Sequence, residues 1–147
     1  MISNFTSKFT NEKIDCIKVR DAYYVIPAKL LEINIGIKQE SMGLFLGENK
    51  GNKFYPSLAL LEKISPESNE KIIVKDIGEM DYIYGKNLRQ RHIKNVLGET
   101  KVGFLKLVVN ERDECLGYGK IVKPLNEKGV VFKNILDRGD YLRREKV

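Results

Sequence analysis

The sequence predicts an α+β protein in which a small antiparallel α/β domain, residues 1–77, precedes a small, mostly β domain, residues 78–147. Two observations favour this order: strand-like runs bounded by turn residues recur along the whole chain, and the clearest helical periodicity lies in its first half. A third is a change of charge between the two halves. With 147 residues and 42% hydrophobic content, the chain can bury one sizeable core or two small ones.

In the first half, several segments combine alternating apolar residues with flanking turns. These predicted strands are 14–19, 23–26, 42–46, 53–55 and 71–75. The first two form a predicted hairpin that turns at residues 20–22, and the next two flank a glycine- and asparagine-rich turn, residues 47–52. Short helices are predicted over 27–36 and 58–64, each beginning at or just after a proline.

The second half begins with a predicted linker, residues 76–79, after which the chain changes character. Three strand-like runs follow, and these are 102–109, 115–122 and 129–133. Helices are predicted there only over 86–94 and 137–145. Asp137 and Asp140 are best explained as charges at the start of the second of these helices.

The two halves differ in net charge. Residues 1–83 carry 11 Lys+Arg and 12 Asp+Glu, a net charge of −1, whereas residues 84–147 carry 15 and 8, a net charge of +7. A basic surface gains free energy when it displaces counterions from phosphates, so the asymmetry indicates a polyanion partner for the second half. The alternative is a solvated basic face without a partner.

Residues 86–94, here called the basic segment, are the first candidate site. They hold four permanent cations and no acid, and these cations are Lys86, Arg89, Arg91 and Lys94. On a helix, like charges this close repel one another, and bound phosphate would relieve the repulsion. Short basic helices on a solvated face are common, so phosphate contact competes with a purely structural explanation.

The C-terminus holds the second candidate site, formed by Arg143, Arg144 and Lys146. Cations near the end of a helix complement its dipole without any partner. One cation would suffice for that, however, and two adjacent guanidinium groups suit phosphate oxygens and stack on bases. RNA contact is therefore the favoured interpretation of this pair.

Residues suited to catalysis are few, and the sequence predicts a protein that is not an enzyme and needs no cofactor or metal. His92 lies among cations that would lower its pKa, with no carboxylate nearby in the sequence. Cys16 and Cys115 are far apart and are predicted to be free thiols packed as small hydrophobes. The run from Leu116 to Gly119 lacks the spacing of a phosphate-binding loop, and its glycines predict a bulge or a close backbone approach. No segment resembles a membrane span or a signal peptide, which predicts a cytoplasmic protein without a membrane partner.

Several motifs resemble the Nip-seven-type ribosome-biogenesis proteins, in the order in which they occur there. The motifs are Tyr23-Tyr24-Val25, Leu46-Gly47 with Lys53-Phe54, Tyr82-Ile83-Tyr84-Gly85, Leu116-Gly117-Tyr118-Gly119 and the stretch from Asp137 to Glu145. The resemblance implies an α/β domain followed by a PUA domain, a β pseudo-barrel that in this family binds single-stranded, uridine-rich RNA. It also implies a role in large-subunit pre-ribosomal RNA processing, with other ribosome-assembly proteins as partners. The family's basic C-terminal contact residues correspond to Arg143 and Arg144, followed by Lys146, and the single arginine pair resembles archaeal members.

The chain departs from this family pattern at two places, and it has a second resemblance. It holds little of the family's N-terminal helical region, and Lys86 stands where asparagine usually follows the glycine. Residues 43–60 also resemble the C-terminal domain of bacterial ribosomal-RNA cytosine methyltransferases of the Nop-two/Sun group. Two alternatives follow: a stand-alone RNA-targeting module for a separate ribosomal-RNA or transfer-RNA modification enzyme, and a protein-interaction adaptor.

Overall fold

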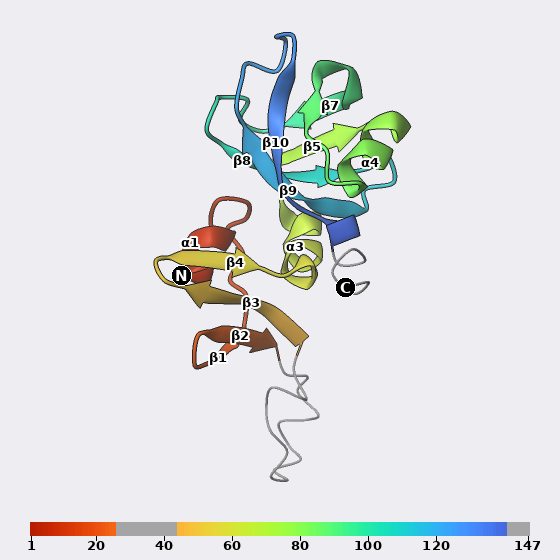
Figure 1. Ribbon diagram of the computed structural model, residues 1–147. Helices are drawn as coiled ribbons and strands as arrows, with labels where there is room; N and C mark the ends of the chain where they lie inside the picture. The colour runs from red at the N-terminus through yellow and green to blue at the C-terminus, as the bar shows by residue number, and fades with distance from the viewer. Residues whose placement is uncertain (26–43, 141–147) are drawn as a thin grey trace.

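The computed structural model describes residues 1–25 and 44–140, whose strands form two sheets (Figure 1). The first sheet is antiparallel, in the order β1 (Ile17–Val19), β2 (Ala22–Val25), β3 (Leu44–Lys50) and β4 (Lys53–Pro56). The second has the order β6 (Leu88–Arg89), β10 (Val130–Asp137), β9 (Cys115–Ile121), β8 (Leu105–Val109), β5 (Lys71–Val74) and β7 (Ile93–Leu97). The helix predicted over 27–36 and the cations Arg143, Arg144 and Lys146 lie outside the described residues. The predicted α+β class with a curled second sheet is confirmed.

The first sheet contains the two predicted hairpins, with one correction. The β1–β2 hairpin turns at Arg20 and Asp21, as predicted. The glycine-rich turn predicted over 47–52 is wrong in extent, because β3 continues to Lys50 and pairs with β4 as far as Lys53. Only Gly51 and Asn52 remain as the turn, and the positive φ of Gly51, 60°, suits a tight connection between strands.

Helix α3 (Leu58–Ile64) joins the two sheets and matches the predicted helix. The Leu60 amide donates to the Ser57 hydroxyl at 3.2 Å, which caps the first turn. Its buried leucines belong to a core cluster that also contains Leu107 and Tyr118 of the second sheet. In Figure 1, α3 lies between β3 below it and β9 above it. The two halves of the chain therefore share this apolar cluster, and a second cluster, which includes Ile72, Leu88 and Phe132, lies within the second sheet and α4.

Helix α1 (Ile2–Thr6) was not predicted from the sequence, although it contributes to the same core. Ile2, Phe5 and Phe9 are buried, with the spacing of one helical face for the first two and a following turn for the third. The Phe5 ring lies edge-on to the Tyr118 ring at 5.3 Å between centroids. The N-terminal segment is thus packed directly against the second sheet.

The predicted linker, residues 76–79, is wrong, because it forms the first turn of α4 (Asp76–Ile83). A Cβ at Gly78 would lie 2.7 Å from the His92 carbonyl oxygen, so the glycine permits close packing of this helix. The strand before it, β5, was predicted as part of the first half but lies between β7 and β8 in the second sheet. An isolated fragment beginning at residue 78 would lack this central strand. The domain boundary after residue 77 remains a prediction, and the strand pairing favours one before Lys71.

The helix predicted for the basic segment is also wrong. Residues 88–94 form β6, the 3-10 helix η3 (Gln90–His92) and the start of β7. Leu88 is fully buried opposite Phe132 of β10, and β7 pairs with β5. Long-range strand pairing and burial thus outweigh the local preference of this charged stretch for a helix.

Strands β8, β9 and β10 confirm the three predicted strands, although β8 begins at Leu105, later than predicted, and β10 is longer than predicted. It continues to Asp137 past a bulge at Ile135, and a helix begins at Arg138. Gly117 has a φ of 149°, and a Cβ there would collide with the Leu136 carbonyl group. The close backbone approach predicted for this glycine is therefore made by the neighbouring strand.

Candidate nucleic-acid interface

Two buried lysines of the second sheet are bound to acids. The Lys106 ammonium is fully buried, lies 2.7 Å from Glu70 Oε2, and also donates to the Leu97 carbonyl. Buried Lys71 lies 3.2 Å from Asp113. These charges hold the end of the second sheet together and are not available to a ligand. Net charge alone therefore overstates the basic surface.

Within the described residues, only two of the four cations in the basic segment are free to bind a ligand. Lys86 Nζ lies 3.9 Å from Asp81 Oδ1, and Lys94 Nζ lies 3.6 Å from Glu111 Oε2. Arg89 and Arg91 are exposed and form no ion pair with any residue in the described ranges. The segment contains no acid of its own, but neighbouring elements supply two, which leaves the two arginines as its uncompensated charges.

The buried His92 side chain links this segment to α4 by hydrogen bonds. The expectation that it lacks a nearby carboxylate is wrong, because its Nε2 lies 2.9 Å from Asp81 Oδ2 on α4. Its Nδ1 accepts from the Arg89 amide at 2.9 Å, so the ring proton is on Nε2 and is donated to Asp81. Burial lowers the pKa of His92, with the neighbouring arginines adding to the effect and Asp81 opposing it. Both ring nitrogens are used in structural hydrogen bonds.

A second polar network joins α4 to the end of β10. The Tyr82 hydroxyl lies 2.6 Å from the Tyr118 carbonyl oxygen, and the Asn134 side chain donates to the Tyr82 carbonyl at 3.0 Å. Asp137 accepts from the Asp140 amide at 2.7 Å, which confirms its role at the start of the last helix. The network fixes the end of β10 against α4.

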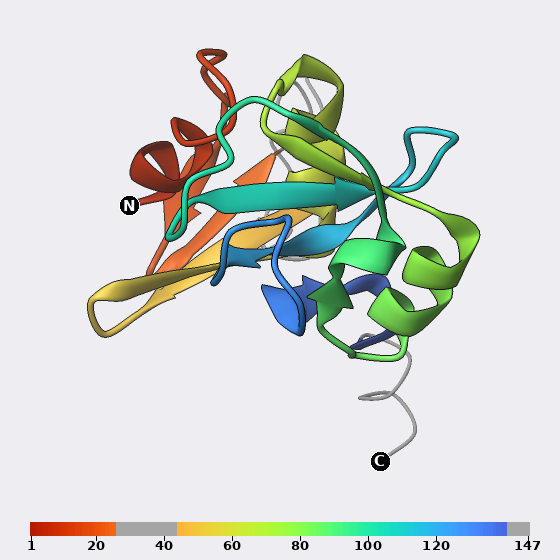
Figure 2. The same cartoon turned by 90° about the horizontal axis from the view of Figure 1, so that it is seen from above.

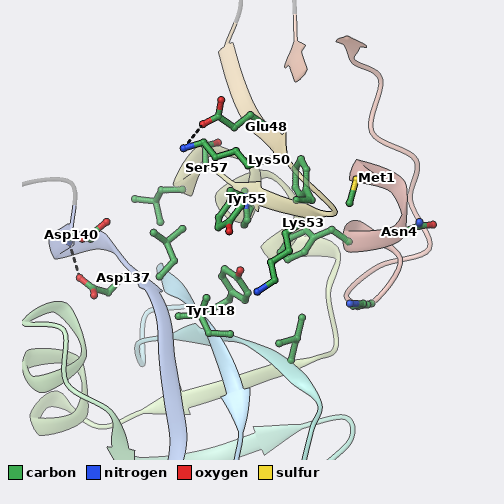
Figure 3. Close-up of a pocket in the computed structure, with 18 of the residues that line it drawn as sticks. Met1, Asn4, Glu48, Lys50, Lys53, Tyr55, Ser57, Tyr118, Asp137 and Asp140 are labelled. Carbon is green, nitrogen blue, oxygen red and sulfur yellow. Dashed lines mark hydrogen bonds and ion pairs between the residues drawn. The ribbon is translucent and has the colours of Figure 1, made fainter. Parts of the chain in front are cut away.

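A groove of about 1250 Å³ is lined by the β3–β4 hairpin, by α1 and by strands β8 to β10, and the sequence did not indicate it. Figure 3 shows Lys53 and Tyr55 pointing into it from the hairpin, towards Tyr118. Tyr55 is 48% exposed, and Ile135 at the β10 bulge is 45% exposed. Its lining residues come from elements far apart in the chain, so no local motif could reveal it.

Two further lysines lie on the face of the second sheet that also carries Tyr118. Lys120 of β9 and Lys133 of β10 are direct cross-strand partners, and both are exposed. Neither has an acidic side chain within ion-pair distance in residues 1–25 or 44–140. The sequence assigns neither residue a role in RNA contact. Lys133, on a strand flank without a matching motif, is expected to matter less than Arg143 and Arg144, and Lys120 is 13 positions away from it.

Membrane-spanning helices and metal-binding groups of side chains are both absent from the described residues. No helix in residues 1–25 and 44–140 is long and apolar enough to cross a membrane. The same residues contain no group of three or more His, Cys, Asp or Glu side chains that could hold a metal ion. Cys115 is a free thiol buried in the core, where burial raises its pKa to about 11, and Cys16 packs against that core.

The curled second sheet with α4 packed against it defines a PUA-domain protein. A conserved PUA domain protein from Thermoplasma acidophilum superposes with a TM-score of 0.63 and 17% identity, covering 98% of this chain and 91% of that one. A PUA-domain structure from Aeropyrum pernix, a tartrate complex, gives 0.59 and 10% identity over 96% of this chain and 83% of that one. Residues 70–146 match the model of the UPF0113 PUA domain, and the chain belongs to this family.

Sequence relatives extend the similarity into the first half. The 60S ribosome subunit biogenesis protein nip7 of Schizosaccharomyces pombe is 25% identical over 136 residues, which cover 86% of this chain and 76% of the relative. A UPF0113 protein of Archaeoglobus fulgidus is 30% identical over 112 residues, 71% of this chain and 62% of the relative. The resemblance expected from the sequence motifs is therefore confirmed.

Proposed function

We propose that this chain is an RNA-binding protein of ribosome biogenesis that acts in the processing or assembly of large-subunit pre-ribosomal RNA. One observation carries the proposal: similarity to proteins named for 60S subunit biogenesis extends through both halves of the chain. A shared PUA domain alone would support RNA binding only. Similarity across both sheets also supports a role in ribosome biogenesis like that of these relatives, because the groove and the shared core are built from both sheets.

The proposal is for binding, not catalysis, and it includes the cytoplasmic location predicted from the sequence. Its ligand is single-stranded RNA, with uridine-rich pre-ribosomal segments preferred, and ribosome-assembly proteins are further partners. The His92 ring, the chain's only imidazole, is held by two structural hydrogen bonds, which supports a structural role for it. RNA contact is assigned to the free arginines Arg89 and Arg91, with Lys86 and Lys94 beside them, and to the C-terminal cations Arg143, Arg144 and Lys146.

The function is tested by ultraviolet crosslinking of the full chain in extract of cells that express it, followed by sequencing of the attached RNA. Precursor large-subunit RNA is the expected ligand. Enrichment of transfer RNA, or recovery of protein partners without RNA, would instead support the targeting-module and adaptor alternatives.

The C-terminal part of the site is tested with Arg143→Ala/Arg144→Ala. We expect about a tenfold or larger loss of affinity for a single-stranded RNA, because two charge-assisted contacts are removed. Lys123→Ala/Lys128→Ala removes two exposed cations from the β9–β10 hairpin and serves as the matched control. Equal affinities of the two variants would move the contact away from the C-terminus.

A further inference from the structure

The paired lysines Lys120 and Lys133 are destabilising as the protein stands. Side chains directly opposite on antiparallel strands lie roughly 5 Å apart at Cβ, and like charges at such positions repel. Both side chains are exposed on the same face of the sheet, and no carboxylate among the described residues pairs with them. An anion bound between them would remove this repulsion.

The lysine pair continues the floor of the groove. Lys120 is the cross-strand partner of Leu105, which lines the groove. Two residues along, the next row consists of Leu107, Tyr118 and Leu136, and it lies against the first sheet and α3. At the row that holds the two lysines, this face of the second sheet is therefore no longer covered by the N-terminal elements and is exposed.

The opposite wall of the groove adds a flat ring and another free cation. Lys53 and Tyr55 are two residues apart on β4, so they lie on one face of the strand. Figure 3 shows both pointing towards Tyr118 on the floor. Lys53 has no ion-pair partner in the described part of the chain, whereas Lys50 is bound to Glu48 at 3.2 Å. The Lys50 ammonium also lies over the Tyr55 ring, 5.8 Å from its centroid, so a base would stack on the other face of the ring. In Figure 2 the β3–β4 hairpin, in yellow, extends on the same side of the molecule as the N-terminus.

Charge is unequal along the groove, which limits how an anion can lie in it. Asp137 and Asp140 line one end, where Asp137 accepts from the Asp140 amide. These carboxylates disfavour phosphate there, whereas Lys53 on the groove lining and the lysine pair beyond that lining favour it. A volume of about 1250 Å³ also exceeds the roughly 300–1,000 Å³ of a pocket for one small ligand.

We propose that this groove binds a short segment of single-stranded RNA, with a base stacked on Tyr55 and the backbone phosphates held by Lys53, Lys120 and Lys133. Exposed rings beside a row of cations are the usual elements of single-strand binding. An acidic peptide could use the lysines, but it would have no use for the half-exposed ring. The inference rests on the proposed RNA-binding function and adds a second contact surface to the C-terminal cations.

The test measures binding of the full chain to a fluorescent 12-nucleotide single-stranded RNA by anisotropy at several salt concentrations. We expect Lys120→Gln/Lys133→Gln to weaken binding about tenfold and to reduce the salt slope by about 1.4, since each lost phosphate contact contributes about 0.7. The matched control Lys123→Gln/Lys128→Gln removes the same charge from the loop that joins these two strands and should change affinity less than about threefold. The melting temperature of each variant shows whether it is folded.

The stacking contact is tested at Tyr55 with three substitutions. Tyr55→Phe keeps the ring and should bind like the parent, whereas Tyr55→Leu and Tyr55→Ala should each lose about fivefold or more. The inference is overturned if folded Lys120/Lys133 and Lys123/Lys128 variants lose equal affinity, or if Tyr55→Leu binds like the parent. It is also overturned if poly-glutamate competes with the same dependence on Tyr55. In all three cases a parent that still crosslinks to precursor ribosomal RNA leaves the proposed function standing.

Discussion

The basic segment and the lysine pair Lys120–Lys133 are two basic regions of one domain with opposite origins. The segment concentrates four cations within nine residues, yet Asp81 and Glu111 approach two of them and His92 braces it from inside. The lysine pair is dispersed in sequence and is brought together by strand pairing without any acid among the described residues. Density of charge in the sequence is therefore a poor guide to which charges remain free in the fold.

The largest effect on stability should come from removing the acid that pairs with a fully buried cation. Glu70→Ala leaves the buried Lys106 ammonium without its counter-ion, and we expect a loss of about 3 kcal/mol in the free energy of unfolding. Urea denaturation measures the change. Adding Lys106→Met to this variant should recover most of the stability, and failure to recover it would mean that Glu70 acts mainly through its contact with the Glu99 amide.

The brace within the basic segment should have the next largest effect. His92→Leu removes the hydrogen bonds to Asp81 and to the Arg89 amide, and we expect the free energy of unfolding to fall by about 2 kcal/mol. Arg91→Ala, in the same 3-10 turn but exposed, should stay within about 0.5 kcal/mol of the parent. Similar losses in both variants would contradict the division into a buried brace and a free surface.

The two regions should also differ in their response to pH. The pKa of His92 is lowered in the fold by burial, so below about pH 6.5 the unfolded chain takes up a proton before the folded one does. Stability is therefore complete above pH 6.5 and declines as the pH falls towards the folded pKa. Because His92 is the only histidine, His92→Gln should abolish this contribution between pH 7 and 5, and an unchanged profile in that variant would assign it to carboxylates.

The smallest predicted effect is the change in the free energy of unfolding when two lysine charges are removed. It should have opposite signs in the two regions, which makes it a direct test of the comparison. Lys120→Gln/Lys133→Gln should raise the free energy of unfolding by about 0.5 kcal/mol, because a cross-strand repulsion is removed. Lys86→Gln/Lys94→Gln should lower it by a few tenths, roughly 0.3 kcal/mol, because two exposed ion pairs are lost. Thermal unfolding at low salt measures both. Changes of the same sign would contradict the assignment of free and compensated charges.

Most strands and α3 could be predicted because their residues alternate or repeat locally and are bounded by proline and glycine. Helix α4 could not, since Ile77 and Met80 are exposed on its outer face and Gly78 is a weak helix former. Helix α1 left a signal in the spacing of Ile2 and Phe5, but five residues are too few for periodicity to decide.

The candidate site could be predicted only in part, for a related reason. Charge asymmetry and the family motifs indicated RNA binding and a basic second half. Long-range pairing decides which cations are free, as Lys120 and Lys133 illustrate, and the groove is lined by residues of two sheets, such as Tyr55 and Tyr118. Neither relationship has a local sequence signature.

The core shared through α3 has a consequence for cooperativity. Leu60 and Leu61 pack with Leu107 and Tyr118, so neither sheet can lose its structure without exposing apolar surface of the other. We therefore expect calorimetry to give one transition whose van't Hoff and calorimetric enthalpies agree. Phe5, packed on Tyr118, also holds the N-terminal segment against the second sheet at the groove, and we expect a bound strand to fit the groove without rotation of one sheet against the other.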